Sequence, residues 1–404
     1  MTSNGTTTAS GRLPLTGITV VAVEQAVAGP LATRHLADLG ARVIKVERPA
    51  EGDFARKYDH AVHGLATHFV WLNRGKESLA VDLKSPRGRR IVGELVARAD
   101  VFLHNTAPGV VERLGLDAGT LRAADPRLIV ANISGYGTSG PRKDRKAYDM
   151  LVQAESGMVA VTGTPDTPTK TGVPSADIAA GLYTATSVLG ALFRRERTGE
   201  GAVIDVSMFD SAVEWMGHPL YMQLYGGRQI PRMGLSHAAI APYDAYPTAD
   251  GQILIGVQND RGWRTLVSDV FGAPEHADDP RFATNVARVR HRTECDELVA
   301  GYTRLWSTTE LDERLATAGI PAAQINGTAD LVEHPQLSER DRWRSVSTEA
   351  GDIRGVLPPM TFRDVELPMR AVPALGQHNH QILAELDMLD DDAPQPTMEE
   401  LPDA

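Results

Sequence analysis

The sequence predicts an α/β protein with a large domain built on a doubly wound parallel sheet and a smaller α+β domain. Strand and helix patterns alternate over the first 150 residues, as in βαβ proteins. A stretch rich in glycine and proline, residues 226–242, separates that part from a second group of short segments. The chain has 404 residues, 42% of them hydrophobic, which is enough for two packed domains.

The large domain begins with a predicted βαβ unit. A buried strand is expected at GITVVAV (17–23), a helix at PLATRHLADLG (30–40), where proline opens the helix and glycine follows its end, and a strand at ARVIKVE (41–47). Further strands are predicted at SLAVDL (78–83), VFLHN (101–105) and RLIVANIS (127–134), and a helix over 86–98 follows the N-cap candidate Ser85. Right-handed parallel crossovers between these strands make a Rossmann-like sheet.

Later segments set the expected domain boundaries. A long apolar helix follows residue 177, and GAVIDVSMFDSAVEWM (201–216) predicts a strand and a helix. Short strands and helices between 251 and 319 predict the compact α+β segment. We expect residues 1–225 to form the large domain, 226–330 a small domain with its linkers, 331–388 a return to the large domain, and 389–404 an acidic flexible tail.

Composition argues against several classes of function. A net charge of −11 disfavours nucleic-acid binding, which needs a concentrated basic face. The first fifteen residues resemble neither a signal nor a transit peptide, and no stretch is expected to span a membrane. The single cysteine, Cys295, is expected on a surface helix and fits a reducing, cytoplasmic location. With no HExxH motif, no metal site is predicted.

Two motifs follow the strand at 127–134. GYGTSG (135–140) has the spacing of a dinucleotide fingerprint, but the polar PRKDRKAYD that follows does not predict the helix which such a fingerprint opens. PRKDRK is either a solvated turn or part of a phosphate site. Further basic residues follow other strands and favour a polyphosphate ligand at one rim of the sheet: Lys45, Arg48, Arg74, Lys76 and Lys84.

The stretch PSADIAAG (174–181) places one carboxylate, Asp177, at the start of the long apolar helix. Its local pattern is typical of a helix N-cap. A carboxylate at a helix N-terminus is also expected to stay ionised and can act as a nucleophile. No GxSxG motif offers a serine nucleophile, so both interpretations of Asp177 stay open at this point.

From about Leu15 to Met388 the chain resembles the class III coenzyme A transferases, a family that includes formyl-CoA and carnitine-CoA transferases and shares its fold with 2-methylacyl-CoA racemases. The resemblance is carried by AGPLATRHLADLGARVIKVERP, NRGKESLAVDLK, NTAPGVVERLGL, ISGYGTSGP, AYDMLVQAESGMVAVTG, PSADIAAGLYTATSVLGALFRRERTGEG, IDVSMFDS and IAPYDAYPTADG. It implies CoA transfer between carboxylic acids, with CoA and acyl-CoA as substrates and no permanently bound cofactor.

The resemblance also implies site residues. Asp177 matches the family's nucleophile, which forms a mixed anhydride and then an aspartyl-CoA thioester. The positions that match CoA contacts are Val27, Ala28, Arg48, Val81, Asp82, Leu83, Lys84, Asn105, Thr106, Ala107, Arg113, Lys146, Ala147, Tyr148 and Asp149. Among these, the arginines and lysines are expected to pair with the nucleotide phosphates.

Substrate and assembly are further implications of the resemblance. GDFARKYDHAVHGLATHFVWLNRGKES (52–78) looks most like the branch that acts on four- and five-carbon dicarboxylates such as succinate, itaconate, mesaconate or citramalate. GLSHAAIAPYD (234–244) lacks the glycine run of formyl-CoA transferases. Family members form interlocked homodimers, so a homodimer is expected, with no nucleic-acid or membrane partner.

Three alternative functions stay open. A racemase would use a histidine at the position of Tyr148, and a tyrosine is a poor base near neutral pH, so the sequence favours transfer. A thioester hydrolase would admit water to the same anhydride. A protein that only binds acyl-CoA would bind it equally well without the Asp177 carboxylate.

Overall fold

The computed structural model describes residues 12–389, which divide into two compact units. Unit 1 holds the described residues up to 157, residues 171–217 and those from 341 onward, and unit 2 holds residues 158–170 and 218–340. The expected acidic tail lies outside the described residues from position 390 on.

Unit 1 is built on a six-stranded parallel sheet, which confirms the predicted α/β class. The strand order is β3-β2-β1-β4-β5-β6, so the order reverses between β1 and β4, and ligands of doubly wound sheets bind at such a reversal. The register pairs Val21 with Ile44 on one side of β1 and with Phe102 on the other. The strands are β1 (Thr19–Val23), β2 (Arg42–Glu47), β3 (Lys76–Ala80), β4 (Val101–His104), β5 (Ile129–Ser134) and β6 (Val203–Ser207).

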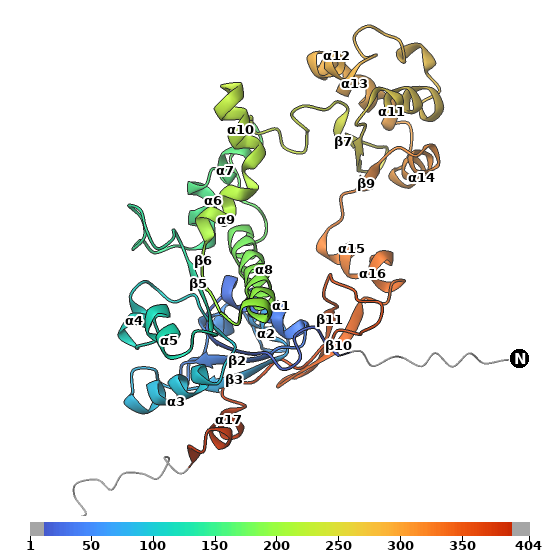
Figure 1. The fold of residues 1–404 in the computed structure, drawn as a ribbon. Helices are drawn as coiled ribbons and strands as arrows, with labels where there is room; N and C mark the ends of the chain where they lie inside the picture. Colours follow the sequence, from blue (N-terminus) through green and yellow to red (C-terminus); the bar gives the residue numbers. More distant parts are fainter. Residues whose placement is uncertain (1–11, 390–404) are drawn as a thin grey trace, which may run out of the picture. The chain divides into compact units, whose positions relative to one another are not determined.

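Helices cover both faces of this sheet (Figure 1). One face buries a core of aliphatic side chains against α3 and α17, with Ile91 and Ile382 fully buried. The predicted cap of α3 is confirmed, because Ser85 Oγ accepts the Gly88 N–H at 2.9 Å. The helices of unit 1 are α1 (Ala28–Asp38), the 3-10 turn η1 (Phe54–Lys57), α2 (Thr67–Asn73), α3 (Pro86–Ala97), α4 (Val110–Arg113), α5 (Ala118–Ala124), α6 (Asp149–Glu155), α8 (Ser175–Thr198), α9 (Met208–Trp215) and α17 (Asn379–Glu385).

Helices α1 and α8 pack against each other at unusually short range. A Cβ built on Gly181 of α8 would lie 2.8 Å from the Ala28 carbonyl oxygen and 3.1 Å from the Leu31 side chain of α1. Only glycine allows that approach without a shift of one helix. The close packing brings the N-terminus of α1 to the first turn of α8.

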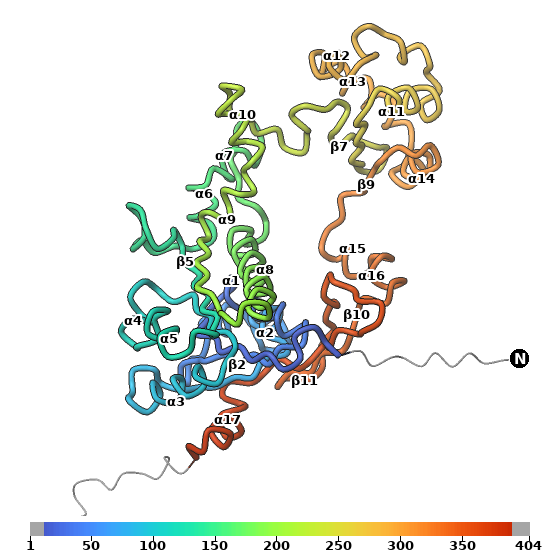
Figure 2. The backbone as a smooth tube through the Cα atoms, in the orientation of Figure 1, coloured from blue at the N-terminus to red at the C-terminus, as the bar shows by residue number. Residues whose placement is uncertain are grey.

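The C-terminal segment of the described chain returns to unit 1, beside the N-terminal strands (Figure 2). Asn379 in α17 accepts the Ala80 N–H at 2.8 Å and donates to the Ala80 carbonyl, and His378 accepts the Ser78 N–H at 3.1 Å. These bonds occupy backbone groups of the edge strand β3. An antiparallel hairpin, β10 (Trp343–Thr348) and β11 (Gly351–Val356), precedes α17.

Unit 2 is an α+β structure, as predicted for the small domain. Its antiparallel sheet has the order β7-β8-β9, and its core packs the fully buried Trp263 with Phe282, Leu311 and Cys295. Its elements are α7 (Met158–Val161), α10 (Gly217–Gly226, whose first residue belongs to unit 1), β7 (Tyr243–Pro247), β8 (Gln252–Gly256), α11 (Asp260–Thr265), the π-helical turn η2 (Leu266–Val270), the 3-10 turn η3 (Pro274–His276), α12 (Asn285–Arg290), α13 (Arg292–Thr303), α14 (Thr308–Ala318), β9 (Ala322–Gln324), α15 (Thr328–Val332) and α16 (Pro335–Ser338).

One expectation from the sequence was wrong. Cys295 is fully buried in α13 rather than exposed, because its face of the helix packs into the core of unit 2. Helix α8 has 24 residues and is long and apolar enough to cross a membrane by length and composition, although half of that apolar window is buried inside the protein. The core helix of a globular protein passes the same test.

Candidate active site

The sequence-predicted site residues follow the carboxyl ends of five parallel strands, which meet at one edge of the sheet. Val27 and Ala28 follow β1, Arg48 follows β2, and residues 81–84 follow β3. Residues 105–107 and Arg113 follow β4, and residues 146–149 follow β5. Asp177 reaches the same edge because α8 begins there before leading into β6.

Asp177 is the third residue of α8 and not its N-cap, which corrects the simpler interpretation of PSADIAAG. The helix starts at Ser175, and Pro174 precedes it without a side-chain cap. The cap comes from a different helix, because Asp149 Oδ1 in α6 accepts the N–H groups of Ala176 and Asp177 at 2.8 and 3.2 Å. The Asp177 side chain is therefore free of the capping role and is only partly buried.

A polar network holds Asp149 in this position. Gln153, one turn along α6 and fully buried, donates to Asp149 Oδ2 at 2.6 Å. The Gln153 side-chain oxygen Oε1 accepts the Thr171 N–H at 3.0 Å, and the Thr171 and Ser175 hydroxyls share a hydrogen bond of 2.8 Å. Gln153 was not singled out in the sequence, since its glutamine side chain has no recognisable local signal.

Two groups from elsewhere in unit 1 complete the surroundings of Asp177. The Ala28 backbone N–H, at the start of α1, donates a hydrogen bond to the Asp177 carboxylate. Tyr58, just after η1, lies close enough to Asp177 and Tyr148 for their charges to act on it, and burial, Asp53 and Asp177 together raise the pKa of Tyr58 to about 12. Tyr58 was missed in the sequence because only the folded chain brings it to this edge.

Burial, helped by the neighbouring charge of Asp149 and opposed by the Ala28 hydrogen bond, raises the pKa of Asp177 to about 7. The expectation that Asp177 stays ionised at its helix N-terminus is thus wrong. The backbone N–H groups at the start of α8, which would have stabilised its charge, donate to Asp149 instead. Near neutral pH the carboxyl group is divided between its acid and its nucleophilic carboxylate form.

This raised pKa predicts a pH-dependent effect of Asp177→Asn on stability. Between about pH 4, the ordinary range for Asp, and about pH 7, folded Asp177 keeps a proton that the unfolded chain releases. Its stabilising contribution is complete below about pH 4 and is lost as the pH rises through about 7. We expect urea unfolding to show the variant gaining on the order of 3 kcal/mol relative to wild type over this range.

The control for that experiment is Asp166→Asn, at an exposed aspartate in the turn 164–167. It should leave the pH dependence of the unfolding free energy as it is in wild type. If the unfolding free energies of wild type and Asp177→Asn changed in parallel with pH, this would contradict a raised pKa of Asp177.

The predicted CoA contacts fall into two groups. Ala28, Asp149 and Tyr148 lie around Asp177. Val27 belongs to the neighbouring turn after β1, and Asn105 joins that turn because its side-chain amide bonds both the N–H and the C=O of Gln25, at 2.9 and 2.8 Å. The remaining residues stand on separate loops at the same edge, and Arg48, Lys84, Arg113 and Lys146 are all exposed there. Asp82 Oδ1 accepts the Lys84 N–H and shapes the turn before α3.

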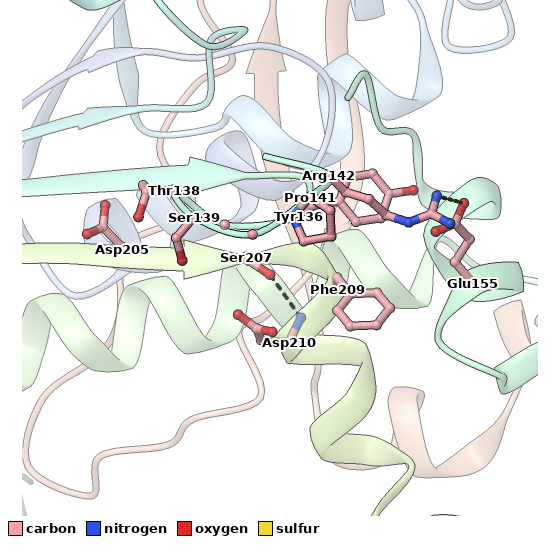
Figure 3. Close-up of a pocket in the computed structure, with 12 residues that line it drawn as sticks. Tyr136, Thr138, Ser139, Pro141, Arg142, Glu155, Asp205, Ser207, Phe209 and Asp210 are labelled. Atoms are coloured by element: carbon pink, nitrogen blue, oxygen red, sulfur yellow. Dashed lines mark hydrogen bonds and ion pairs between the residues drawn. The ribbon is translucent and has the colours of Figure 1, made fainter. Parts of the chain in front are cut away.

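The basic cluster after β5 is partly neutralised. Arg142 and Arg145 both pair with Glu155, at 2.7 and 3.1 Å. Arg142 and Glu155 border a pocket of about 550 Å³ at the ends of β5 and β6, lined by Tyr136, Asp205, Phe209 and Asp210 among others (Figure 3). The pocket is lined by part of the GYGTSGPR segment, but neither Asp177 nor any of the predicted CoA contacts lines it. Within residues 12–389, no group of three or more His, Cys, Asp and Glu side chains is arranged to hold a metal ion.

The sequence model of CoA-transferase family III matches residues 15–379. The chain belongs to this family. A succinate–glutarate CoA-transferase from Agrobacterium fabrum is 37% identical to this CoA-transferase over 93% of the chain and 96% of the relative. A succinyl-CoA–D-citramalate CoA-transferase from Chloroflexus aurantiacus is 34% identical over 94% of the chain and 95% of the relative.

A solved structure of a CAIB/BAIF family protein from Brucella suis resembles this CoA-transferase, with a TM-score of 0.83 and 38% sequence identity. The match covers 93% of the chain and 100% of that protein. The predicted family and enzyme class are therefore confirmed: the protein is a CoA-transferase that uses CoA thioesters and carboxylic acids.

Proposed function

We propose that this enzyme transfers CoA between two carboxylic acids through covalent intermediates on Asp177, and that these acids are four- or five-carbon dicarboxylates. The observation that carries the proposal is the setting of Asp177: a carboxyl group with a pKa near neutrality, partly accessible, with a backbone N–H directed at it. It stands at the sheet edge that the proposed CoA contacts share.

The first half of the reaction forms the enzyme-bound thioester. The Asp177 carboxylate attacks the thioester carbonyl of the donor, and the C–S bond breaks to give a mixed anhydride and CoA thiolate. The thiolate then attacks the Asp177 carbonyl carbon of the anhydride and releases the donor acid as its carboxylate. The Ala28 N–H, which already bonds the Asp177 carboxylate, is placed to stabilise the negative oxygen formed on that carbon.

The second half runs the same steps in reverse with the acceptor. Its carboxylate attacks the aspartyl-CoA carbonyl and expels CoA thiolate, and the thiolate attacks the acceptor carbonyl of the new anhydride. This forms the product thioester and returns the Asp177 carboxylate. A serine could not complete this cycle, because the group that carries CoA must itself be a carboxylic acid derivative.

CoA binding is assigned to the loops around the edge of the sheet. Arg48, Lys84, Arg113 and Lys146 have exposed cationic groups that can pair with phosphates. Arg113 folds back over its own loop, since a Cβ on Gly109 would lie 2.9 Å from Arg113 Nη1. The remaining assigned contacts, which include Val81, Leu83, Thr106 and Ala107, would act through backbone or apolar groups.

The dicarboxylate assignment rests on the relatives, several of which are named for succinate, glutarate, citramalate or mesaconate. The racemase alternative is disfavoured by Tyr148, which is exposed at the position where a racemase needs a base. A hydrolase would use the same anhydride. Only the fate of the thioester in the absence of an acceptor acid distinguishes it from a transferase.

Intact-protein mass measurement tests the proposal. Wild type incubated with succinyl-CoA and no acceptor should gain one CoA, with succinate released, and Asp177→Ala should gain none. Butyryl-CoA, which has the same four-carbon chain without the second carboxylate, should label far more slowly. Steady thioester loss without labelling would indicate a hydrolase, and α-proton exchange without labelling would indicate a racemase.

A cytoplasmic location stays a prediction from the single cysteine, and a homodimer stays a prediction from the family resemblance. Helix α10 supports the homodimer, because Tyr221, Leu224 and Tyr225 are 62%, 61% and 83% exposed. Large apolar side chains grouped on one helix are typical of a surface that a partner covers.

A further inference from the structure

The turn between β1 and α1 holds an unusual backbone conformation. Ala26 has a φ of +62°, in the left-handed region that residues other than glycine rarely adopt. A residue stays there only where its surroundings enforce it. The next residue, Val27, is the N-cap of α1 and makes no side-chain capping bond. No cap within α1 therefore fixes the backbone conformation of the turn that precedes the helix.

The Asp53 carboxylate bonds the backbone of this turn. Its Oδ1 and Oδ2 lie 3.0 and 3.2 Å from the Ala26 backbone nitrogen and accept its N–H. Oδ1 also accepts the Ala55 N–H at 2.9 Å, which holds the 3-10 turn η1 against the β1–α1 turn. One carboxylate thus joins two loops that are 27 residues apart in the sequence.

Asp53 is itself held by a buried ionic cluster formed by Glu24, Lys45, Asp53 and Lys76. Lys45 Nζ lies 2.8 Å from Asp53 Oδ2 and 3.5 Å from Glu24 Oε1, and Lys76 Nζ lies 2.7 Å from the same Glu24 oxygen. All four side chains are buried, two of them basic and two acidic, and burial lowers the pKa of Lys76 to about 7. A buried pair of this kind has few alternative arrangements, because either partner alone would be an uncompensated charge.

Ala26, which Asp53 bonds, stands two positions before Ala28, and the Ala28 N–H bonds the Asp177 carboxylate. A change in the Ala26 dihedral angles would reorient the peptide groups that follow and turn this donor away. The side chain of Asp53 is not in the set of proposed CoA contacts, and its hydrogen bonds are made to the protein itself.

We propose that Asp53 is a positioning residue of the active site: it locks Ala26 in the left-handed conformation and so keeps the Ala28 N–H directed at Asp177. This inference rests on the proposed role of Asp177 as the nucleophile. The groups that face Asp177 are Asp149 from α6, the Ala28 N–H from α1, and Tyr58 with Tyr148 at the rim. Among them Ala28 is the one that Asp53 controls.

The test is a pH titration of the Asp177 carboxyl carbon by ¹³C NMR in protein labelled at aspartate, with Asp177→Asn to assign the signal. Asp53→Ala and Asp53→Asn both remove the negative charge, but only Asn keeps an oxygen that can accept the Ala26 N–H. We expect Asp53→Ala to raise the Asp177 midpoint by about one pH unit and Asp53→Asn by clearly less. Loss of the Asp53 charge alone would lower the midpoint equally in both variants.

Asp38→Ala is the matched control, because Asp38 is also a buried carboxylate of unit 1 and pairs with Arg74 at 2.7 Å, at the far end of α1. It should lower stability without moving the Asp177 midpoint. An unchanged or lowered midpoint in folded Asp53→Ala, or equal shifts in the two Asp53 variants, would overturn the proposal.

A second pair of variants leaves the buried charges untouched, in case Asp53→Ala does not fold. Valine strongly disfavours the left-handed conformation and glycine accepts it freely. Ala26→Val should therefore raise the midpoint as Asp53→Ala does, and Ala26→Gly should not; identical midpoints would count against the proposal. The NMR titration needs no turnover, so failure of wild type to form a CoA adduct would refute the proposed function separately.

Discussion

Asp177→Asn is expected to abolish CoA transfer, with a loss in kcat of at least about 10⁴-fold. Asparagine has the size of aspartate and can still accept the Ala28 N–H, so the packing around the first turn of α8 should persist. It lacks the carboxylate that attacks the thioester, and neither intermediate can form. Asp177→Glu keeps a carboxylate but displaces it by one methylene, and we expect an intermediate loss of roughly 10²- to 10³-fold.

The assay is the formation of the acceptor thioester, separated by chromatography, at saturating donor and acceptor. Asp210→Asn is the control: its carboxylate lines the pocket beside β6, which contains none of the proposed site residues. This variant should keep kcat within about threefold of wild type. Substantial transfer by Asp177→Asn, verified by mass to contain no deamidated protein, would contradict the role of Asp177.

Gly181→Ala is expected to have the second-largest effect, on both stability and turnover. The new methyl group would lie 2.8 Å from the Ala28 oxygen and 3.1 Å from Leu31, so α1 must move away from α8. We expect a loss of about 1–3 kcal/mol in unfolding free energy, typical of overpacking. Because the displaced segment carries the Ala28 N–H, kcat should also fall by roughly tenfold or more.

Gly190→Ala on the same helix is the matched control. A Cβ at Gly190 has no neighbour within 4 Å, so alanine should stabilise α8 by about 0.5–1 kcal/mol through helix propensity alone. Urea unfolding and steady-state kinetics on the two variants separate close packing from propensity. Equal unfolding free energies and equal kcat values for the two variants would show that the close packing of α1 on α8 does not constrain the site.

Local patterns were sufficient for much of the fold. Apolar strand runs identified β1, β2, β4 and β5, and the Ser85 cap identified the start of α3. The start of α1 was placed two residues late, at Pro30 instead of Ala28, because Pro30 looks like a first helical residue and Val27 offers no cap. Strand β3 ends at Ala80, earlier than predicted, since residues 82–85 form a turn closed by Asp82.

The sequence by itself determined the fold class and directed attention to Asp177, because periodicity, caps and motif resemblance are properties of neighbouring residues. The tertiary structure decided the chemical state of that residue. Asp149 takes the helix amides, Ala28 supplies a hydrogen bond, and burial raises the pKa of the Asp177 carboxyl group to about 7. These groups come from α6, from the turn after β1, and from the packing of α1 on α8 at Gly181. A pKa depends on charges and solvent exclusion in space, and residues this far apart in the chain meet only after the sheet has formed.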